Sequence, residues 1–155
     1  MKKLKRFEIG NIYSIETRKG LGLFQLVNIP EDKRMDVEMI RVSYHLYAQI
    51  PEDLEGIFVK DFFYVRFPVK AALRRKLIDL AGYVDLEKEF AIPDFFREVD
   101  FFNTDHWIIS NIKDNTFKQV ETLTPEELLY SPEGVWNDTY LKERLEEGWR
   151  LEKWT

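Results

Sequence analysis

"FEIGNIYSIETRKGLGLFQLVNI", residues 7–29, is the stretch that decides the fold class of this chain. In its first half, Tyr13 and Ile15 alternate with polar residues, which is the pattern of a strand with one apolar face. Gly20 and Gly22, within "RKGLG", tolerate the backbone angles of a tight turn, so "LFQLVNI" is expected to return as a second strand. A hairpin of this kind is typical of the opening of a small SH3-like barrel.

Four further stretches complete the expected β structure. "MDVEMIRVSYHLYAQI" (35–50) is rich in β-branched and aromatic residues and predicts one longer strand or two. "IFVKDFFYVRF" (57–67) is apolar on both faces, which predicts a central strand. "HWIISNIKDNTFKQVETL" (106–123) predicts a hairpin turned at "KDNT". "IPDFFREVDFF" (92–102) contains Pro93 and several phenylalanines, and is interpreted as an irregular, buried stretch.

The period of the apolar residues changes from two to that of a helix at "PVKAALRRKLIDLAG" (68–82). Leu73, Leu77 and Leu80 fall on one helical face, together with residues at both ends of the stretch. Gly82 is suited to the position just after a helix. These features predict a helix over the whole stretch, with a cationic outer face.

Two shorter helices are predicted near the end of the sequence. Thr124 and Glu127 have the spacing of a capping box, which predicts a short helix that ends at about Tyr130. Asn137 or Asp138 is expected to cap the last helix. Its buried stripe is predicted at spacings of four residues, and Gly148 is expected to end it. That stripe consists of Leu141, Leu145 and Trp149.

These patterns predict an α+β fold that is rich in β structure: an SH3-like, partly closed antiparallel barrel or sheet with a central helix and C-terminal helices. No repeat or flexible linker interrupts the sequence, so residues 1–155 are interpreted as a single domain. The basic start, "MKKLKRFEIG", has no apolar segment after it and is not expected to be a signal peptide. No apolar run is long enough to span a membrane, and we expect a cytoplasmic protein without membrane partners.

The charge of the chain is unevenly distributed. The net charge is −5, and the whole excess lies from residue 121 onward, where there are nine acidic and four basic residues. An acidic surface disfavours nucleic acid and favours basic partners, so no nucleic-acid partner is expected. The same segment holds three of the four tryptophans, at positions 136, 149 and 154.

Catalytic patterns are absent from the sequence. The chain has no cysteine, no P-loop and no G-x-S-x-G motif, and its two histidines, His45 and His106, belong to no metal-ligand pattern. Carboxylate pairs are numerous, but 28 acidic residues make pairs by chance unavoidable. We therefore predict no catalytic residues, no metal site and no cofactor.

Several motifs together resemble the immunity protein 26 family of bacterial polymorphic-toxin systems. These motifs are "FEIGNIYSI", "GLGLFQLV", "PDFF", "HWII", "LTPEE" and, most specifically, "GVWNDTYLKERLEEGW". The similarity extends roughly from Phe7 to Trp154, although residues 35–82 match mainly in pattern. The resemblance implies a β-rich α+β fold and a protein that binds and neutralises a cognate toxin domain in the cytoplasm of the producing cell. It supplies no catalytic residues.

The acidic surface and the aromatic residues near the end of the sequence suggest where such a toxin would bind. An acidic face could complement the basic cleft of a nuclease, and exposed aromatic residues often anchor interfaces. Glu143 and Glu147 repel each other at a spacing of four residues, a small cost that hints at a function. The predicted partner-binding residues are Glu143, Glu146, Glu147, Glu152 and Trp154.

Two other classes of function stay open at this point, as does the oligomeric state, for which we expect a monomer or a weak dimer. The first is a small hydrolase with an unrecognised site, which stoichiometric zinc or manganese in the purified protein would favour. The second is a barrel-type adaptor that binds peptides, which recovery of many unrelated partners would favour.

Overall fold

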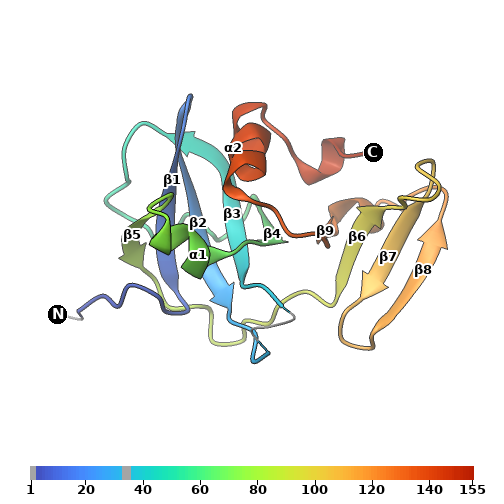
Figure 1. The fold of residues 1–155 in the computed structure, drawn as a ribbon, viewed down its shortest axis with the longest axis horizontal. Helices are drawn as coiled ribbons and strands as arrows, with labels where there is room; N and C mark the ends of the chain where they lie inside the picture. The colour runs from blue at the N-terminus through green and yellow to red at the C-terminus, as the bar shows by residue number, and fades with distance from the viewer. Residues whose placement is uncertain (1–2, 33–35) are drawn as a thin grey trace.

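Two β-sheets lie side by side, and a helix near the C-terminus packs over the first of them (Figure 1). The computed structural model describes residues 3–32 and 36–155. The first sheet is antiparallel, with the order β4-β3-β2-β1-β5. Its strands are β1 (Asn11–Thr17), β2 (Gly20–Asn28), β3 (Met39–Tyr47), β4 (Phe62–Arg66) and β5 (Asp79–Tyr83).

The second sheet has the order β8-β7-β6-β9, and β8 forms its outer edge (Figure 1). Its strands are β6 (Phe95–Val99), β7 (Trp107–Asn111), β8 (Thr116–Val120) and β9 (Ser131–Pro132). The short β9 pairs in parallel with β6, whereas the other neighbours are antiparallel. The helical elements are α1 (Val69–Arg74), η1 (Glu127–Leu129), α2 (Asp138–Glu146) and η2 (Leu151–Lys153).

The opening hairpin is confirmed. Tyr13 lies opposite Phe24 in the β1–β2 pair, and both side chains are buried in the main core. Gly20 has a φ of +136° at the turn, a backbone conformation that residues other than glycine rarely adopt. A Cβ atom at Gly22 would lie 2.6 Å from Cδ1 of Leu145, so this glycine allows α2 to approach the hairpin closely.

The main core fills the space between the first sheet and the helices. Leu141 and Leu145 of α2 are buried there, and Trp149 packs against the same cluster, as the helical stripe predicted. Asn137 caps the helix, because its side-chain oxygen accepts a hydrogen bond of 2.8 Å from the N–H of Tyr140.

The capping box and the stop signal are also confirmed. The N–H of Thr124 donates to the Glu127 carboxylate at 2.9 Å, and the N–H of Glu127 donates to Oγ1 of Thr124 at 3.1 Å. The helix that they begin is a single 3₁₀ turn, η1. Gly148 follows α2 with a φ of +71°, in the left-handed region expected for a helix stop.

The long helix predicted over residues 68–82 is wrong in its second half. α1 ends at Arg74, and Lys76 has a φ of +57°, which lies outside the range of a right-handed helix. The chain then enters β5, in which Gly82 lies opposite Ile12 of β1. Pairing with β5 satisfies the backbone groups on the side of β1 that faces away from β2, and this tertiary requirement overrides the helical period.

Two strand predictions also need correction. β4, expected to be central, lies at the end of the first sheet. Its outer side is covered instead by the segment after β9, where the N–H of Trp136 donates to the carbonyl of Arg66 at 3.0 Å. Residues 92–102, expected to be irregular and buried, contain the regular strand β6. Of the strand predicted over 35–50, β3 forms the part from Met39 to Tyr47, and Met35 lies outside the described residues.

The prediction of a β-rich α+β fold is confirmed, and the two sheets do not close into a barrel. Among the described residues, 3–32 and 36–155, no helix is long and apolar enough to cross a membrane.

Candidate functional site

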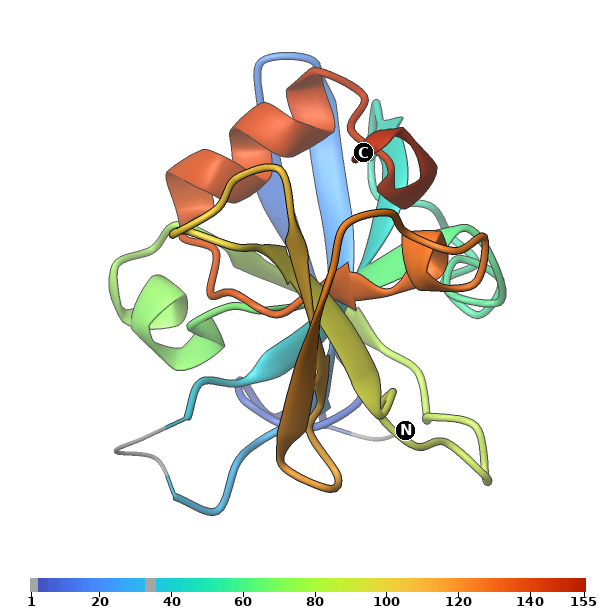
Figure 2. The same ribbon diagram turned by 90° about the vertical axis from the view of Figure 1, so that its right-hand side faces the viewer.

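One face of the second sheet is covered by other parts of the chain, and the other face is exposed. Neighbouring residues of a strand point to opposite faces. Arg97 and Glu98 are consecutive in β6 and therefore lie on different faces. Glu98 is opposite Ile108 of β7, and Ser110 of β7 is opposite Phe117 of β8, so these four side chains share one face. Figure 2 views the molecule from the side of this sheet.

The face that carries Arg97 is covered by the C-terminal part of the chain. The guanidinium of Arg97 donates to four backbone carbonyls. The Cζ atom of Arg97 lies 4.7 Å from the ring centre of Trp107 and 4.3 Å from that of Trp154. The acceptors are the carbonyls of Tyr130 (3.2 Å), Trp154 (2.6 Å), Leu128 (3.0 Å) and Leu151 (2.8 Å). Burial lowers the pKa of Arg97 to about 10, which still leaves the side chain charged at neutral pH.

The opposite face exposes large apolar side chains. Phe101 is 86% exposed, Phe102 100% and Phe117 77%, and together with Ile108 they line one shallow depression of about 500 Å³. We call these four residues the phenylalanine face. Single exposed apolar side chains are common on protein surfaces, whereas a contiguous group such as this one makes the face a candidate interaction site.

The loop that presents Phe101 and Phe102 is held by Asp100. Its carboxylate accepts a hydrogen bond from the N–H of Phe102 at 2.9 Å and from Nε2 of Gln119 at 2.6 Å. These bonds, the backbone bond foremost, lower the pKa of Asp100. The two phenylalanines are therefore displayed by an anchored loop, which limits the entropy that binding would cost.

Two carboxylates border the phenylalanine face. Glu98 is half-buried and accepts hydrogen bonds from the N–H groups of Val99 (3.1 Å) and Gly134 (3.3 Å). Oγ of Ser110 donates to Glu133 at 2.6 Å. Burial raises the pKa of Glu98, and the charge of Glu133 raises it further. In the described part of the chain, no basic nitrogen lies within 4.0 Å of either carboxylate.

A groove of about 490 Å³ continues from this face toward α2. Glu98 and Phe101 line both the groove and the depression, so the two form one surface. We call this second part the aromatic groove, and its principal lining side chains are Glu98, Phe101, Trp136, Tyr140, Trp149 and Trp154.

The predicted partner-binding glutamates do not form a single free acidic patch. Glu146 accepts a hydrogen bond of 2.7 Å from the N–H of Arg18, and Glu147 lies 3.1 Å from Nε of Arg144. Arg144 also approaches Glu143, at 4.0 Å, and so offsets the repulsion between Glu143 and Glu147. The predicted binding role of these residues stays a prediction.

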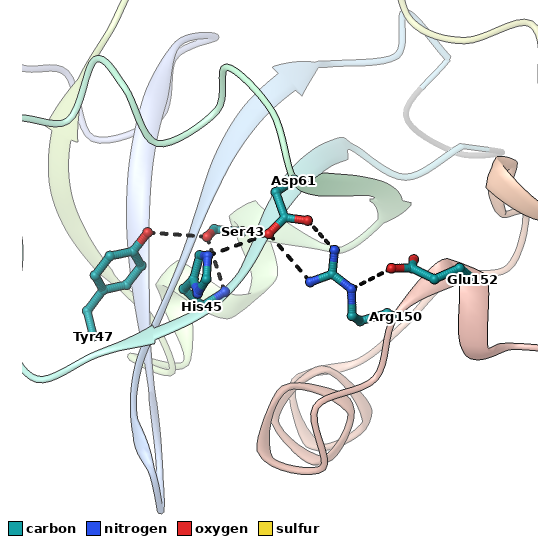
Figure 3. A network of polar contacts seen from close by, with 6 residues as sticks. All are labelled: Ser43, His45, Tyr47, Asp61, Arg150 and Glu152. Atoms are coloured by element: carbon teal, nitrogen blue, oxygen red, sulfur yellow. Dashed lines mark hydrogen bonds and ion pairs between the residues drawn. The ribbon is translucent and has the colours of Figure 1, made fainter.

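Trp154 and Glu152, the other two predicted residues, lie in different surroundings. Trp154 is half-buried, stacks on Arg97 and also lines the aromatic groove, so it belongs to the candidate site. Glu152 accepts a hydrogen bond of 2.6 Å from Nε of Arg150 and belongs to a separate polar cluster (Figure 3).

That polar cluster fastens the C-terminal segment to the first sheet. Arg150 pairs with Asp61 as well as Glu152, and its Cζ lies 4.2 Å from the ring centre of Tyr44. The hydrogen bond from Arg150 lowers the pKa of Asp61. Asp61 has a φ of +66°. Burial raises the pKa of Tyr44 to about 12. The N–H of Leu151 donates to the Tyr44 hydroxyl at 3.3 Å, so backbone and side chains hold the segment together.

The same cluster contains the residue types of a serine hydrolase but not their arrangement. Nε2 of His45 lies 3.5 Å from Asp61, whereas Oγ of Ser43 contacts the Tyr47 hydroxyl at 3.3 Å and the backbone N–H of His45 at 3.3 Å (Figure 3). A nucleophile needs a hydrogen bond to the ring of its base, which this geometry does not provide. The cluster is better explained as a structural fastening.

His106, the second histidine, lies 3.2 Å from the exposed carboxylate of Glu121. Throughout residues 3–32 and 36–155, no three side chains of the metal-binding types are grouped in a way that could hold a metal ion.

Sequence reasoning missed Glu98, Phe101, Phe102 and Phe117. The signal for Phe117 was present, because strict alternation in a hairpin that ends in "TFKQV" puts Phe117 and Gln119 on one face. The signal in "FFREVDFF" was ambiguous, since an apolar run suggests burial whether or not the fold supplies anything to cover it.

Comparison with protein-family models, with curated proteins and with solved structures finds no significant match to this chain.

Proposed function

We propose that this protein binds a cognate bacterial toxin domain and neutralises it by occlusion, using the phenylalanine face as the centre of the interface. One observation carries the proposal: three phenylalanines that are more than three-quarters exposed gather on one face of a sheet. Leaving them in water has a cost that a partner would remove, since each buried Å² of apolar surface contributes about 25 cal/mol.

The surroundings of this face have the layout of an interface. Apolar anchors lie at the centre, and the carboxylates of Glu98 and Glu133 lie beside them. Interfaces of this kind bury roughly 800 Å² per partner, and a few large side chains supply most of the binding energy. The acidic border and the net charge of −5 favour a basic partner, such as a nuclease domain, and speed its association.

The resemblance to the immunity protein 26 family supports the toxin as the partner. In that role the protein acts in the cytoplasm of the producing cell, where it meets toxin delivered by sibling cells. Occlusion requires no chemistry from the antidote itself, only a surface that excludes the substrate of the toxin.

The test is direct binding to a candidate toxin domain, chosen from the genes adjacent to that of this protein. The purified proteins, mixed and separated by size-exclusion chromatography, should give a stoichiometric complex in which the activity of the toxin is lost. Calorimetry should then give a dissociation constant in the nanomolar range or below, as strong inhibitory complexes do, with a binding energy of about −12 kcal/mol or more favourable. Absence of a complex at micromolar concentration and low salt would overturn the proposal.

A further inference from the structure

The aromatic groove has a chemistry that the phenylalanine face lacks. Four rings form a continuous row along it, with distances between ring centres of 4.8 Å for Tyr140–Trp136, 5.2 Å for Trp136–Trp149 and 5.8 Å for Trp149–Trp154. The first two of these pairs meet edge to face, and the third is tilted. Trp136 is buried, so the rings that the groove exposes most are those of Tyr140, Trp149 and Trp154. Ring faces attract cations because their electron density is negative.

Glu98 lines the same groove as these rings. Each of its carboxylate oxygens accepts one backbone hydrogen bond, from Val99 and from Gly134. A carboxylate can accept about four hydrogen bonds in all, so both oxygens keep capacity for another donor. No lysine or arginine is among the described residues that line the groove, and no basic nitrogen of the described residues lies within 4.0 Å of the Glu98 carboxylate.

The protein already uses the combination of a guanidinium with aromatic rings. Arg97 lies against the two indoles of Trp107 and Trp154, which meet edge to face, and Arg144 lies 4.6 Å from the ring centre of Tyr140. In both cases the guanidinium lies over a ring, where it makes more contact than a compact ammonium would. The groove offers a further arginine the same rings and, in addition, a carboxylate.

We propose that the aromatic groove binds an arginine side chain of the partner, with its guanidinium on the tryptophan rings and its paired N–H groups on the Glu98 carboxylate. This inference rests on the proposed function, because it takes the partner to be a protein. It specifies what that partner must present: an exposed arginine next to an apolar patch that covers the phenylalanine face. Two parallel N–H···O bonds give such a pair both strength and orientation.

The inference can be tested without the toxin. N-acetyl-L-argininamide is titrated into the protein while the indole N–H signals of the four tryptophans are followed by NMR, and N-acetyl-L-citrullinamide serves as the uncharged probe of equal shape. We expect the arginine probe to shift the signals of Trp149 and Trp154 with a dissociation constant of about 1 mM, and the citrulline probe to bind about tenfold more weakly. Equal binding of the two probes would overturn the inference, and this comparison requires no variant.

Two variants with the same change of charge locate the site. Glu98→Gln should weaken binding of the arginine probe at least fivefold, whereas Glu52→Gln, at an exposed glutamate on the loop before β4 and outside the groove, should leave it unchanged. An intact spectrum of the remaining signals shows that each variant folds. Unchanged binding to a folded Glu98→Gln protein would also overturn the inference.

The failure of this inference can be distinguished from failure of the proposed function. A protein that binds the toxin but not the arginine probe would contradict the role of the groove alone. A protein that binds the arginine probe at Glu98 but forms no complex with the toxin would contradict the proposed function and leave the groove as an arginine site.

Discussion

Arg97 and Glu98 are neighbours in β6, yet the chain treats their charges in opposite ways. Arg97 is fully buried, and four carbonyls and two indoles from the C-terminal half of the chain surround it. Glu98 is half-buried, holds two backbone N–H groups and has no cationic partner within the described residues. Because consecutive residues of a strand point to opposite faces, the two side chains cannot pair with each other.

This difference separates the structural face of the second sheet from the candidate functional face. A buried charge is tolerated only where hydrogen bonds replace its hydration, and the chain provides these for Arg97 from its own backbone. On the other side it leaves three phenylalanines exposed and a half-buried carboxylate without a cationic partner among the described residues. The covered face should therefore respond to mutation mainly in stability, and the open face mainly in binding.

The largest effect is expected from Arg97→Met. The change leaves buried carbonyls without a donor, at about 1–3 kcal/mol each, so the free energy of unfolding should fall by about 3 kcal/mol or more. Urea unfolding followed by circular dichroism measures the loss. Arg18→Met is the control, because 91% of that side chain is exposed, and it should change stability by less than about 0.5 kcal/mol. A loss below about 1 kcal/mol for Arg97→Met would show that the four carbonyls find other donors.

The next effect concerns the open face and should appear in binding alone. The double variant Phe102→Ser and Phe117→Ser removes two exposed anchors, and its affinity for the toxin domain should fall by about 2 kcal/mol or more, roughly 30-fold. Its stability should change by less than about 0.5 kcal/mol per site. Val59→Ser, at an equally exposed apolar residue on the loop before β4, serves as control and should leave the affinity unchanged. If the double variant binds as the wild type does, the phenylalanine face is not the interface.

A smaller effect should come from the buried arginine of the first sheet, which sharpens the comparison with Arg97. Arg41 is also buried, but it forms hydrogen bonds of 3.1 and 2.8 Å with the half-exposed carboxylate of Glu87. Glu87→Gln keeps one acceptor for Arg41, and solvent screens the charge of the half-exposed Glu87. The free energy of unfolding should therefore fall by about 1 kcal/mol at pH 7.

The same pair gives a pH dependence of known sign. The hydrogen bond from Arg41 lowers the pKa of Glu87, so the pair stabilises the fold above the ordinary glutamate pKa of 4.5, and this contribution disappears as the pH falls below that value. The free energy of unfolding, measured in urea, should therefore fall more between pH 7 and pH 3 for the wild type than for Glu87→Gln. Equal weakening in both proteins would mean that the pair does not contribute.

The smallest effect is expected at Glu98, and its sign is the reverse. Burial raises the pKa of Glu98, so the ionised group destabilises the fold once the pH exceeds the ordinary value of 4.5, and stability is recovered as the pH falls through the raised pKa. Relative to Glu98→Gln, the wild type should lose stability between pH 4 and pH 8. Saturation with the arginine probe should remove this relative loss, because a bound guanidinium favours the ionised carboxylate. A difference that does not change with pH would contradict the burial of this charge.

Much of the local structure could be predicted from the residues alone. Gly20, the Thr124–Glu127 box, Asn137 and Gly148 each act on backbone groups within a few positions of themselves, and all four signals are confirmed. The helix over residues 68–82 could not be predicted correctly, because β5 forms in response to the open side of β1, more than 60 residues earlier in the chain.

The candidate site was only partly predictable for the same reason. The sequence indicated that the acidic excess and three of the four tryptophans lie from residue 121 onward, and one of these, Trp154, both contacts Arg97 and lines the aromatic groove. The glutamates of the last helix attracted attention by their number, but Arg144 of the same helix pairs with Glu143 and Glu147, and a distant residue pairs with Glu146. This residue, Arg18, reaches Glu146 from 128 positions away in the sequence.

The sequence by itself therefore determined the turns, the caps, the apolar stripe of α2 and the β-rich class of the fold, since these follow from periodicity and from contacts within a few residues. The tertiary structure alone decided which face of the second sheet is covered. The carbonyls that accept hydrogen bonds from Arg97 lie 31 to 57 positions away in the chain. Because these segments pack on one face of the sheet, Glu98 and the phenylalanines lie on the other. Alternation along a strand assigns residues to two faces, but only the packing of distant segments determines which of the two meets water.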